Sequence, residues 1–341
     1  MMKKTVFLLV FAGALAIGCA ERGPAKVVLG KSGWDLVALD KEERVLWRVP
    51  VAGVVKSVLE MRGPGDEEGQ YYVAATGREH VRGGADVGAI LLFDATGKRV
   101  WGTHVPQVGP YPAKQLNATS DGMCAVWRVD GQDLYLHCST GGLYPRLVSV
   151  YALARGQDGQ VGLKQRLSYW HCGHITEFRV IRDRTMYMAG LNNSIERYAE
   201  NSYGMSLLRL DVPAPGAANL EGVGPIFGSG RERPGHGAYF YIGLRPLRDS
   251  KTTNEEGPAK PWGESKGLRW EDDRLAWTIR PPGLSSLVTL WFDADGRILE
   301  VRPEQGLEGE YGSVRRPDEP AFTSWLEGIR KAAAEGRHSS K

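Results

Sequence analysis

The densest group of chemically active side chains in this 341-residue chain is the run YWHCGH at residues 169–174. Imidazole and thiolate groups bind zinc and copper, and imidazole is also the commonest general acid or base in enzymes. Two amides follow one strand later, and a further histidine lies on a later connection. We expect these groups to gather at one opening of the fold, which gives the candidate site His171, Cys172, His174, Asn192, Asn193 and His236.

A metal site is the sharper interpretation of this cluster, but its spacing matches no established metal signature and the run contains no carboxylate. The simpler interpretation is structural, with His174 bonded to backbone and Trp170 packed between neighbouring units. A third interpretation is a non-metal ligand site or a catalytic histidine. The chain has no phosphate-binding glycine loop, no G-x-S-x-G motif and no H-E-x-x-H motif. We therefore assign no catalytic residue and expect neither a metal nor another cofactor.

Cys124 and Cys138 flank a strand–turn–strand segment whose turn contains Gly131. Centring the pairing on that glycine places the two cysteines opposite each other, so a cross-strand disulfide is a candidate. Two buried thiols are the alternative, since free cysteine packs as a small hydrophobic residue. Cys172 would have no partner in either case.

The elements that must position these residues are short strands in a repeated pattern. An apolar strand that ends in aspartate, a polar turn and a second strand occur at residues 35–51, 89–105 and 287–303. Longer units of four strands extend this pattern along the chain. We expect such units at residues 54–105, 123–167, 175–223 and 238–303, and a partial first unit before them.

Self-similar units of four strands are the mark of a β-propeller. The sequence therefore predicts an all-β fold with five blades, or six if two have been merged, and a β-sandwich is the alternative. The first unit lacks its inner strands at the N-terminus, and residues 308–315 are the candidate for closing the ring. The stretch 317–336 predicts a C-terminal helix, since Phe322, Trp325, Leu326 and Ile329 share one face.

The segment KVVLGKSGWDLVALDKEERVLWRVPV at residues 26–51 resembles the PQQ-type propeller repeat, with its small-residue strand, its "ALD" strand and its tryptophan strand. Glu43 stands where that family has glycine. The resemblance implies a propeller blade, and many lipoproteins with such repeats bind no quinone. No vicinal Cys-Cys pair, as quinone-dependent dehydrogenases need, occurs here.

The N-terminus reads as an export signal. A basic start and an apolar stretch too short to span a bilayer run into Ala16-Ile17-Gly18-Cys19, which resembles a bacterial lipoprotein processing site. We expect lipidation of Cys19. Ala20, rather than aspartate, follows it, and resemblance to the lipoprotein sorting rule of enteric bacteria implies placement in the outer membrane facing the periplasm. The chain then divides into a signal peptide (1–18), a tether (19–25), the propeller (26–316, with an insertion at 248–267), a helix (317–336) and a tail (337–341).

Charge excludes one class of partner. The formal net charge of +3 falls to about +1 when Lys3 and Lys4 leave with the signal, so no global field favours nucleic acid. These features together predict a lipid-anchored propeller of the cell envelope that binds or scaffolds a protein partner. The alternative is a periplasmic enzyme, a transferase or hydrolase, that uses a histidine in the propeller channel.

Overall fold

The described part of the chain is built entirely from strands. The computed structural model describes residues 24–63, 69–79, 87–106, 118–141, 146–171, 173–193, 202–223, 238–246, 264–280, 287–294, 296 and 298–303. These ranges contain strands β1 to β20 and no helix, so none of them could cross a membrane as a long apolar helix. The expected all-β class is confirmed. Cys19, Cys172, His236 and the segments 308–315 and 317–336 lie outside these residues.

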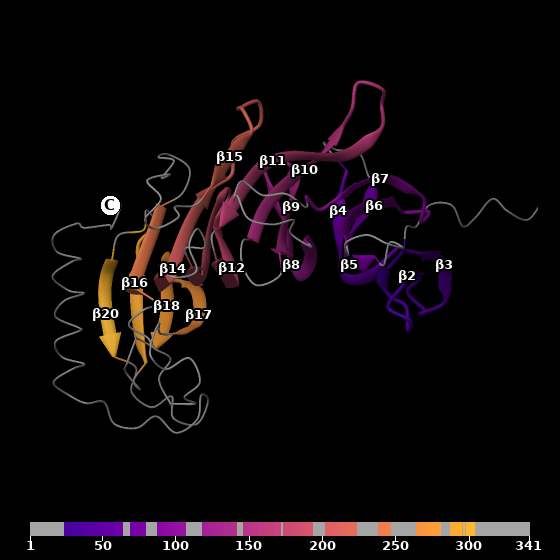
Figure 1. The fold of residues 1–341 in the computed structure, drawn as a ribbon. Coiled ribbons are helices and arrows are strands. Elements are labelled where there is room, and N and C mark those ends of the chain that lie inside the picture. Colours follow the sequence, from indigo (N-terminus) through magenta and orange to yellow (C-terminus); the bar gives the residue numbers. More distant parts are fainter. Residues whose placement is uncertain are drawn as a thin grey trace, which may run out of the picture.

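The strands form five sheets that follow one another in chain order, from β2 and β3 at the right of Figure 1 to β20 at the left. The first sheet is β1 (Lys26–Leu29), β2 (Asp35–Leu39) and β3 (Val45–Pro50). The second is β4 (Val54–Arg62), β5 (Gln70–Glu79), β6 (Val87–Asp94) and β7 (Arg99–His104). The third contains β8 (Ala118–Val129), β9 (Gln132–Gly141), β10 (Arg146–Arg155), β11 (Val161–His171) and β15 (Leu220–Val223).

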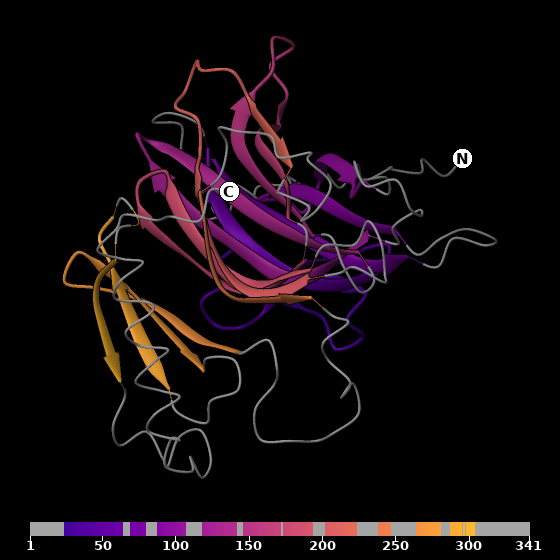
Figure 2. The same cartoon turned by 60° about the vertical axis from the view of Figure 1, so that its left-hand side comes forward.

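The fourth sheet is β12 (Gly173–Arg182), β13 (Thr185–Asn193), β14 (Ser202–Asp211) and β16 (Ala238–Pro246). The fifth is β17 (Glu264–Glu271), β18 (Arg274–Arg280), β19 (Val288–Phe292) and β20 (Ile298–Pro303). Figure 2 shows the second to fourth sheets in layers, one behind another, with the fifth sheet at an angle to them.

Two of the expected strand assignments are wrong. β15 was expected to complete the fourth unit, but it pairs in parallel with β11 of the third sheet. β16 was expected to begin the fifth unit, but it pairs with β14 of the fourth sheet. The first strand of the fifth sheet is instead β17, which includes residues 264–267 of the predicted insertion. Strand patterns show which residues can form strands but not which edge each strand joins, because pairing is a tertiary contact.

The sheets pack face to face because most central strands are apolar on both faces. In β13, Met186 and Met188 enter the core shared with the third sheet, and Tyr187 and Ala189 enter the core shared with the fifth. This alternation follows from the two-residue period of a strand. Four such cores connect the five sheets in order, so each sheet is stabilised chiefly by its neighbours.

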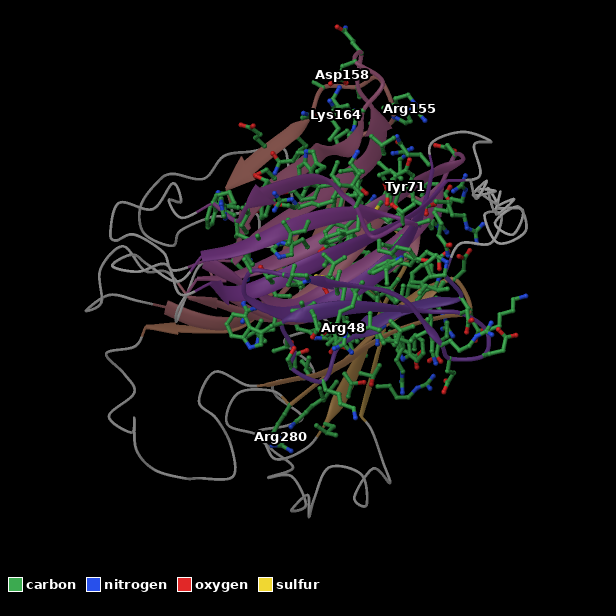
Figure 3. All side chains as sticks on the ribbon, turned by 90° about the vertical axis from the view of Figure 1, so that its right-hand side faces the viewer. Arg48, Tyr71, Arg155, Asp158, Lys164 and Arg280 are labelled. Atoms are coloured by element: carbon green, nitrogen blue, oxygen red, sulfur yellow. The ribbon has the colours of Figure 1, made fainter. Side chains whose placement is uncertain are left out.

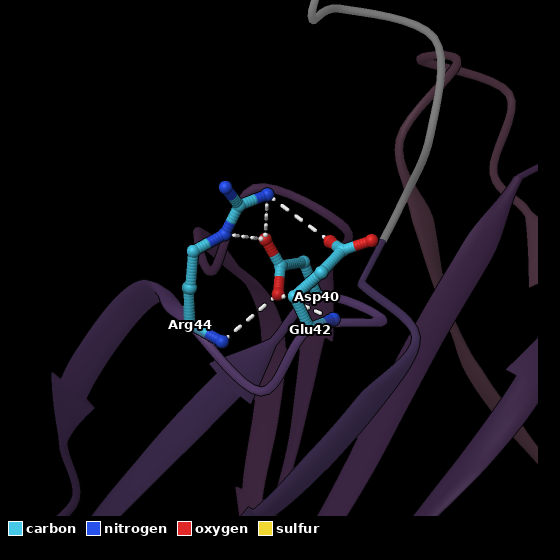
Figure 4. A network of polar contacts seen from close by, with 3 residues as sticks. All are labelled: Asp40, Glu42 and Arg44. Carbon is cyan, nitrogen blue, oxygen red and sulfur yellow. Dashed lines mark hydrogen bonds and ion pairs between the residues drawn. The ribbon is translucent and has the colours of Figure 1, made fainter.

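Each sheet has one end with mostly short turns, which we call the turn edge, and an opposite end, the loop edge, where the chain passes from one sheet to the next except between β14 and β15. At the turn edge, Asp40 accepts hydrogen bonds from the backbone N–H groups of Glu42 and Arg44, at 3.0 and 2.8 Å, and pairs with the Arg44 guanidinium (Figure 4). Asp94 accepts the equivalent N–H groups of Thr96 and Lys98. The repeated aspartate in the sequence is therefore a turn-forming residue.

Aromatic side chains join the turn edges of successive sheets. The Trp47 indole donates to the Ala95 carbonyl oxygen at 2.9 Å, which joins the first sheet to the second. Trp127 donates to Asp183 O at 2.7 Å, from the third sheet to the fourth. The Tyr187 hydroxyl donates to a turn of the fifth sheet, at Ala294 O. Trp47, Trp127 and Tyr187 therefore have a structural role, in holding neighbouring sheets together.

The candidate disulfide between Cys124 and Cys138 is not formed, and neither residue is in a disulfide. The turn between β8 and β9 contains two residues, so the register pairs Val129 with Gln132 and places Cys124 opposite His137. The expected register was wrong by one residue. That difference places the two thiols on opposite faces of the sheet.

Candidate functional site

The backbone brings several of the predicted site residues to the loop edge where the third sheet meets the fourth. His171 is the last residue of β11, is 1% exposed and lies opposite Arg146 of β10. His174 pairs with Leu191 near the start of β12, and the neighbouring Gly173 pairs with Asn192, so Asn193 lies at the same end of β13. Register thus collects four predicted residues: His171, His174, Asn192 and Asn193.

His171 and Arg146 are both buried, and burial lowers the pKa of the Arg146 guanidinium. A buried cation of this kind is costly unless neighbouring groups compensate it. The pairing therefore places two buried polar residues at the loop edge of the third sheet.

A second polar group lies between the second and third sheets, and sequence reasoning did not identify it. Its members face one interface, near the middle of the strands. We call it the polar seam: Ser57 of β4, Cys124 of β8, Tyr135 and His137 of β9, and Ser149 of β10.

Strand pairing brings the polar seam together. Cys124 lies directly opposite His137, and His137 lies directly opposite Ser149, so the three side chains form a row on one face of the third sheet. The Tyr135 hydroxyl donates a hydrogen bond to Cys124 Sγ at 3.3 Å. The rings of Tyr135 and His137 are 6.3 Å apart between centroids.

Burial controls the protonation of these groups. His137 is 1% exposed, and loss of solvation lowers its pKa to about 4, so the imidazole is neutral at physiological pH. Burial is also the first cause that raises the pKa of the Tyr135 hydroxyl well above its usual value, so Tyr135 keeps its proton. On the other face of the sheet, burial raises the pKa of the Cys138 thiol.

Three buried polar atoms in the polar seam have no hydrogen-bond partner: Ser57 Oγ, His137 Nε2 and Ser149 Oγ. The two serine hydroxyls lie near the Tyr135 and Tyr151 hydroxyls without reaching normal hydrogen-bond geometry. Buried polar atoms are nearly always bonded to protein or to ordered water, so a group of three in one interface is unusual. A small polar ligand, an ion or water would satisfy them.

Among the residues that the structure describes, no three or more His, Cys, Asp and Glu side chains are grouped to hold a metal ion. A site of the usual three- or four-ligand kind is therefore not assembled in these ranges. The polar seam offers a smaller donor set, one thiol and one imidazole.

The sequence did contain a signal for the polar seam. In the segment LYLHCS at residues 134–139, tyrosine, histidine and serine alternate with leucine and cysteine, so one face of the strand is polar. What the sequence could not supply was the partner across the strand pair. That partner depends on a register that the two-residue turn sets.

Comparison with known proteins adds little. No protein-family model matches the chain, and no curated protein sequence matches it. Among solved structures, a point mutant of the Synechocystis apocarotenoid oxygenase is similar at 9% identity, over 85% of this chain and 70% of that chain, with a TM-score of 0.28. A similarity at that level carries no argument about function.

Proposed function

We propose that this chain is a lipid-anchored β-propeller of the cell envelope that binds a protein partner through its loop edge. The stacked sheets support the propeller interpretation, since each packs against the next as blades do, although the described sheets form an open row. Closure into a ring by residues 308–315 and lipidation at Cys19 are parts of the same proposal.

The observation that carries the proposal is the asymmetry between the two edges of the sheets. The turn edge is held by aspartate-bonded turns and by aromatic hydrogen bonds between sheets. The loop edge carries most of the connections between sheets, residues 212–219 between β14 and β15 being the described exception. Loops on a rigid scaffold are the usual place for recognition. We assign the binding surface to the loop edge for this reason.

Site-specific photo-crosslinking in membranes of the native host tests this assignment. A crosslinking amino acid is placed at exposed positions of the loop edge, Trp34, Ala52 and His104, and at the exposed turn-edge positions Lys41, Asp158 and Asp272. The proposal predicts one specific adduct from the loop-edge positions and none from the turn-edge positions. Equal labelling from both edges, or no specific adduct at all, would contradict it.

A channel enzyme remains the second candidate, because pairing brings His171, His174 and Asn192 to the same end of neighbouring strands. The two candidates respond differently to His174→Ala. An enzyme loses turnover, whereas a binding module keeps its crosslinked partner. The lipid anchor is tested separately, since Cys19→Ala should abolish incorporation of labelled fatty acid.

A further inference from the structure

The part of the polar seam that the proposed function does not use is the pair Cys124 and His137. The two residues are directly opposite each other on neighbouring strands and lie on the same face. Side chains in such a position have Cβ atoms about 4.5–5.5 Å apart, so a sulfur and an imidazole nitrogen can bind one ion between them. We propose that Cys124 and His137 form a binding site for a monovalent thiophilic cation, with Cu(I) as the metal that fits it.

The donor atoms are suited to that ion. His137 Nε2 is buried and has no hydrogen-bond partner, and the imidazole is neutral, which is the form that binds metals. Cys124 receives a hydrogen bond from the Tyr135 hydroxyl, which stabilises negative charge on the sulfur. Soft thiolate ligands select Cu(I), and imidazole also suits copper.

Charge balance distinguishes Cu(I) from a divalent ion. When Cu(I) binds, the thiol proton leaves to solvent and one positive charge replaces another, so the site stays neutral. Zinc would leave one uncompensated positive charge beside the buried His137, which is unfavourable in a low-dielectric interior. Zinc also takes four ligands in structural sites, whereas Cu(I) is stable with two.

The position of the pair allows an ion to enter. Cys124 lies on β8, at one side of the third sheet, and is partly exposed. His137 lies one strand further in. The ladder between β8 and β9 is also irregular between Ser120 and Cys124, a feature that often accompanies sites where a side chain is redirected.

Cu(I) titration of the reduced full-length chain against a chromogenic Cu(I) chelator tests the site under anaerobic conditions. Wild type should bind one equivalent at least tenfold more tightly than Cys124→Ser or His137→Gln. Two matched controls should retain that affinity: Cys138→Ser, a thiol on the opposite face of the same sheet, and His104→Gln, an exposed histidine. The site is refuted if wild type binds no more tightly than the two site variants, or if Cys138→Ser loses the same equivalent.

A second measurement does not depend on how well Cys124→Ser folds. Cu(I) should slow alkylation of Cys124 in wild type, measured by mass spectrometry, and His137→Gln should lose this protection. Equal protection in both proteins overturns the role of His137. A parallel titration with Zn(II) should show at least a tenfold weaker effect, and equal protection by Zn(II) overturns the assignment to a monovalent ion.

Discussion

The turn edge and the polar seam treat polar groups in opposite ways. At the turn edge, Asp94 accepts two backbone N–H groups and the Trp47 indole donates to the neighbouring sheet. In the polar seam, His137 Nε2 and two serine hydroxyls are buried without partners. A satisfied polar group stabilises a fold, and an unsatisfied one costs roughly 1–3 kcal/mol. The difference indicates that the turn edge serves stability, and that the polar seam is the better place to look for a bound ligand.

The hairpin of β10 and β11 resembles the turn edge, because its polar groups are hydrogen-bonded. It extends beyond the neighbouring sheets in Figure 1, and Arg155 and Asp158 lie at its tip in Figure 3. Asp158 accepts the Gln160 N–H, and Arg155 donates to Gly159 O, so its polar groups are bonded within the turn. Gly159 is left-handed, with φ at 77° and nothing near the position of a Cβ.

The largest predicted effect is at Gly97, which tests whether the turn edge holds sheets together. Gly97 has φ at 83°, and an added Cβ would meet Trp47 Cδ2 at 2.8 Å. Gly97→Ala should therefore combine backbone strain with displacement of the indole and lower the free energy of unfolding by about 4 kcal/mol. Gly159→Ala is the matched control, with strain but no clash, and should cost about 1 kcal/mol. If urea denaturation gives similar losses in the free energy of unfolding for Gly97→Ala and Gly159→Ala, the contact between Gly97 and Trp47 does not contribute to stability.

The polar seam should make stability depend on pH. The pKa of His137 is about 4 in the folded chain and 6.5 when unfolded, so this contribution is fully present above pH 6.5 and is lost as pH falls toward 4. The expected loss is about 3 kcal/mol. His137→Gln should remove this component, measured by denaturation of the metal-free chain from pH 7.5 to 4.5. If the free energy of unfolding of His137→Gln depends on pH as that of the wild type does, His137 is not the group responsible.

Removing one hydrogen bond between sheets should have a smaller effect. Trp47→Phe keeps most of the aromatic surface but loses the N–H that donates to Ala95 O. The expected loss is about 1 kcal/mol in the free energy of unfolding. Trp34→Phe changes a tryptophan that is 47% exposed and should leave the unfolding midpoint unchanged. If Trp47→Phe and Trp34→Phe change the free energy of unfolding equally, the hydrogen bond of the Trp47 indole does not stabilise the turn edge.

The smallest effect is a gain in stability. Glu43 has φ at 60°, a left-handed conformation at the position where the equivalent turn has Gly97. Glu43→Gly relieves that strain and loses only an exposed ion pair with Lys26, so the melting temperature should rise by about 1–3 °C. Glu43→Ala removes the same ion pair without relieving the strain and should give no increase. A lower melting temperature for Glu43→Gly would mean that the ion pair outweighs the strain.

The local pattern was sufficient for part of this description. The alternation of apolar residues predicted β4–β7 and β8–β11, and the repeated aspartate predicted the turns after β2 and β6, because both depend on residues near in sequence. The partner of β16 was not predictable in this way. Its apolar residues suit the edge of either of two sheets, and only packing decides between them.

The sequence by itself determined that the described part of this chain is all-β, where several of its turns lie, and that Tyr135 and His137 share one face of a strand. The tertiary structure decided what that face meets. Because the turn between β8 and β9 has two residues, Cys124 lies opposite His137 and not opposite Cys138. The second sheet packs on the face of the third sheet that carries Cys124 and His137. A shift of one residue exchanges the two faces of a strand, so the difference between a disulfide and a candidate ion site depends on register.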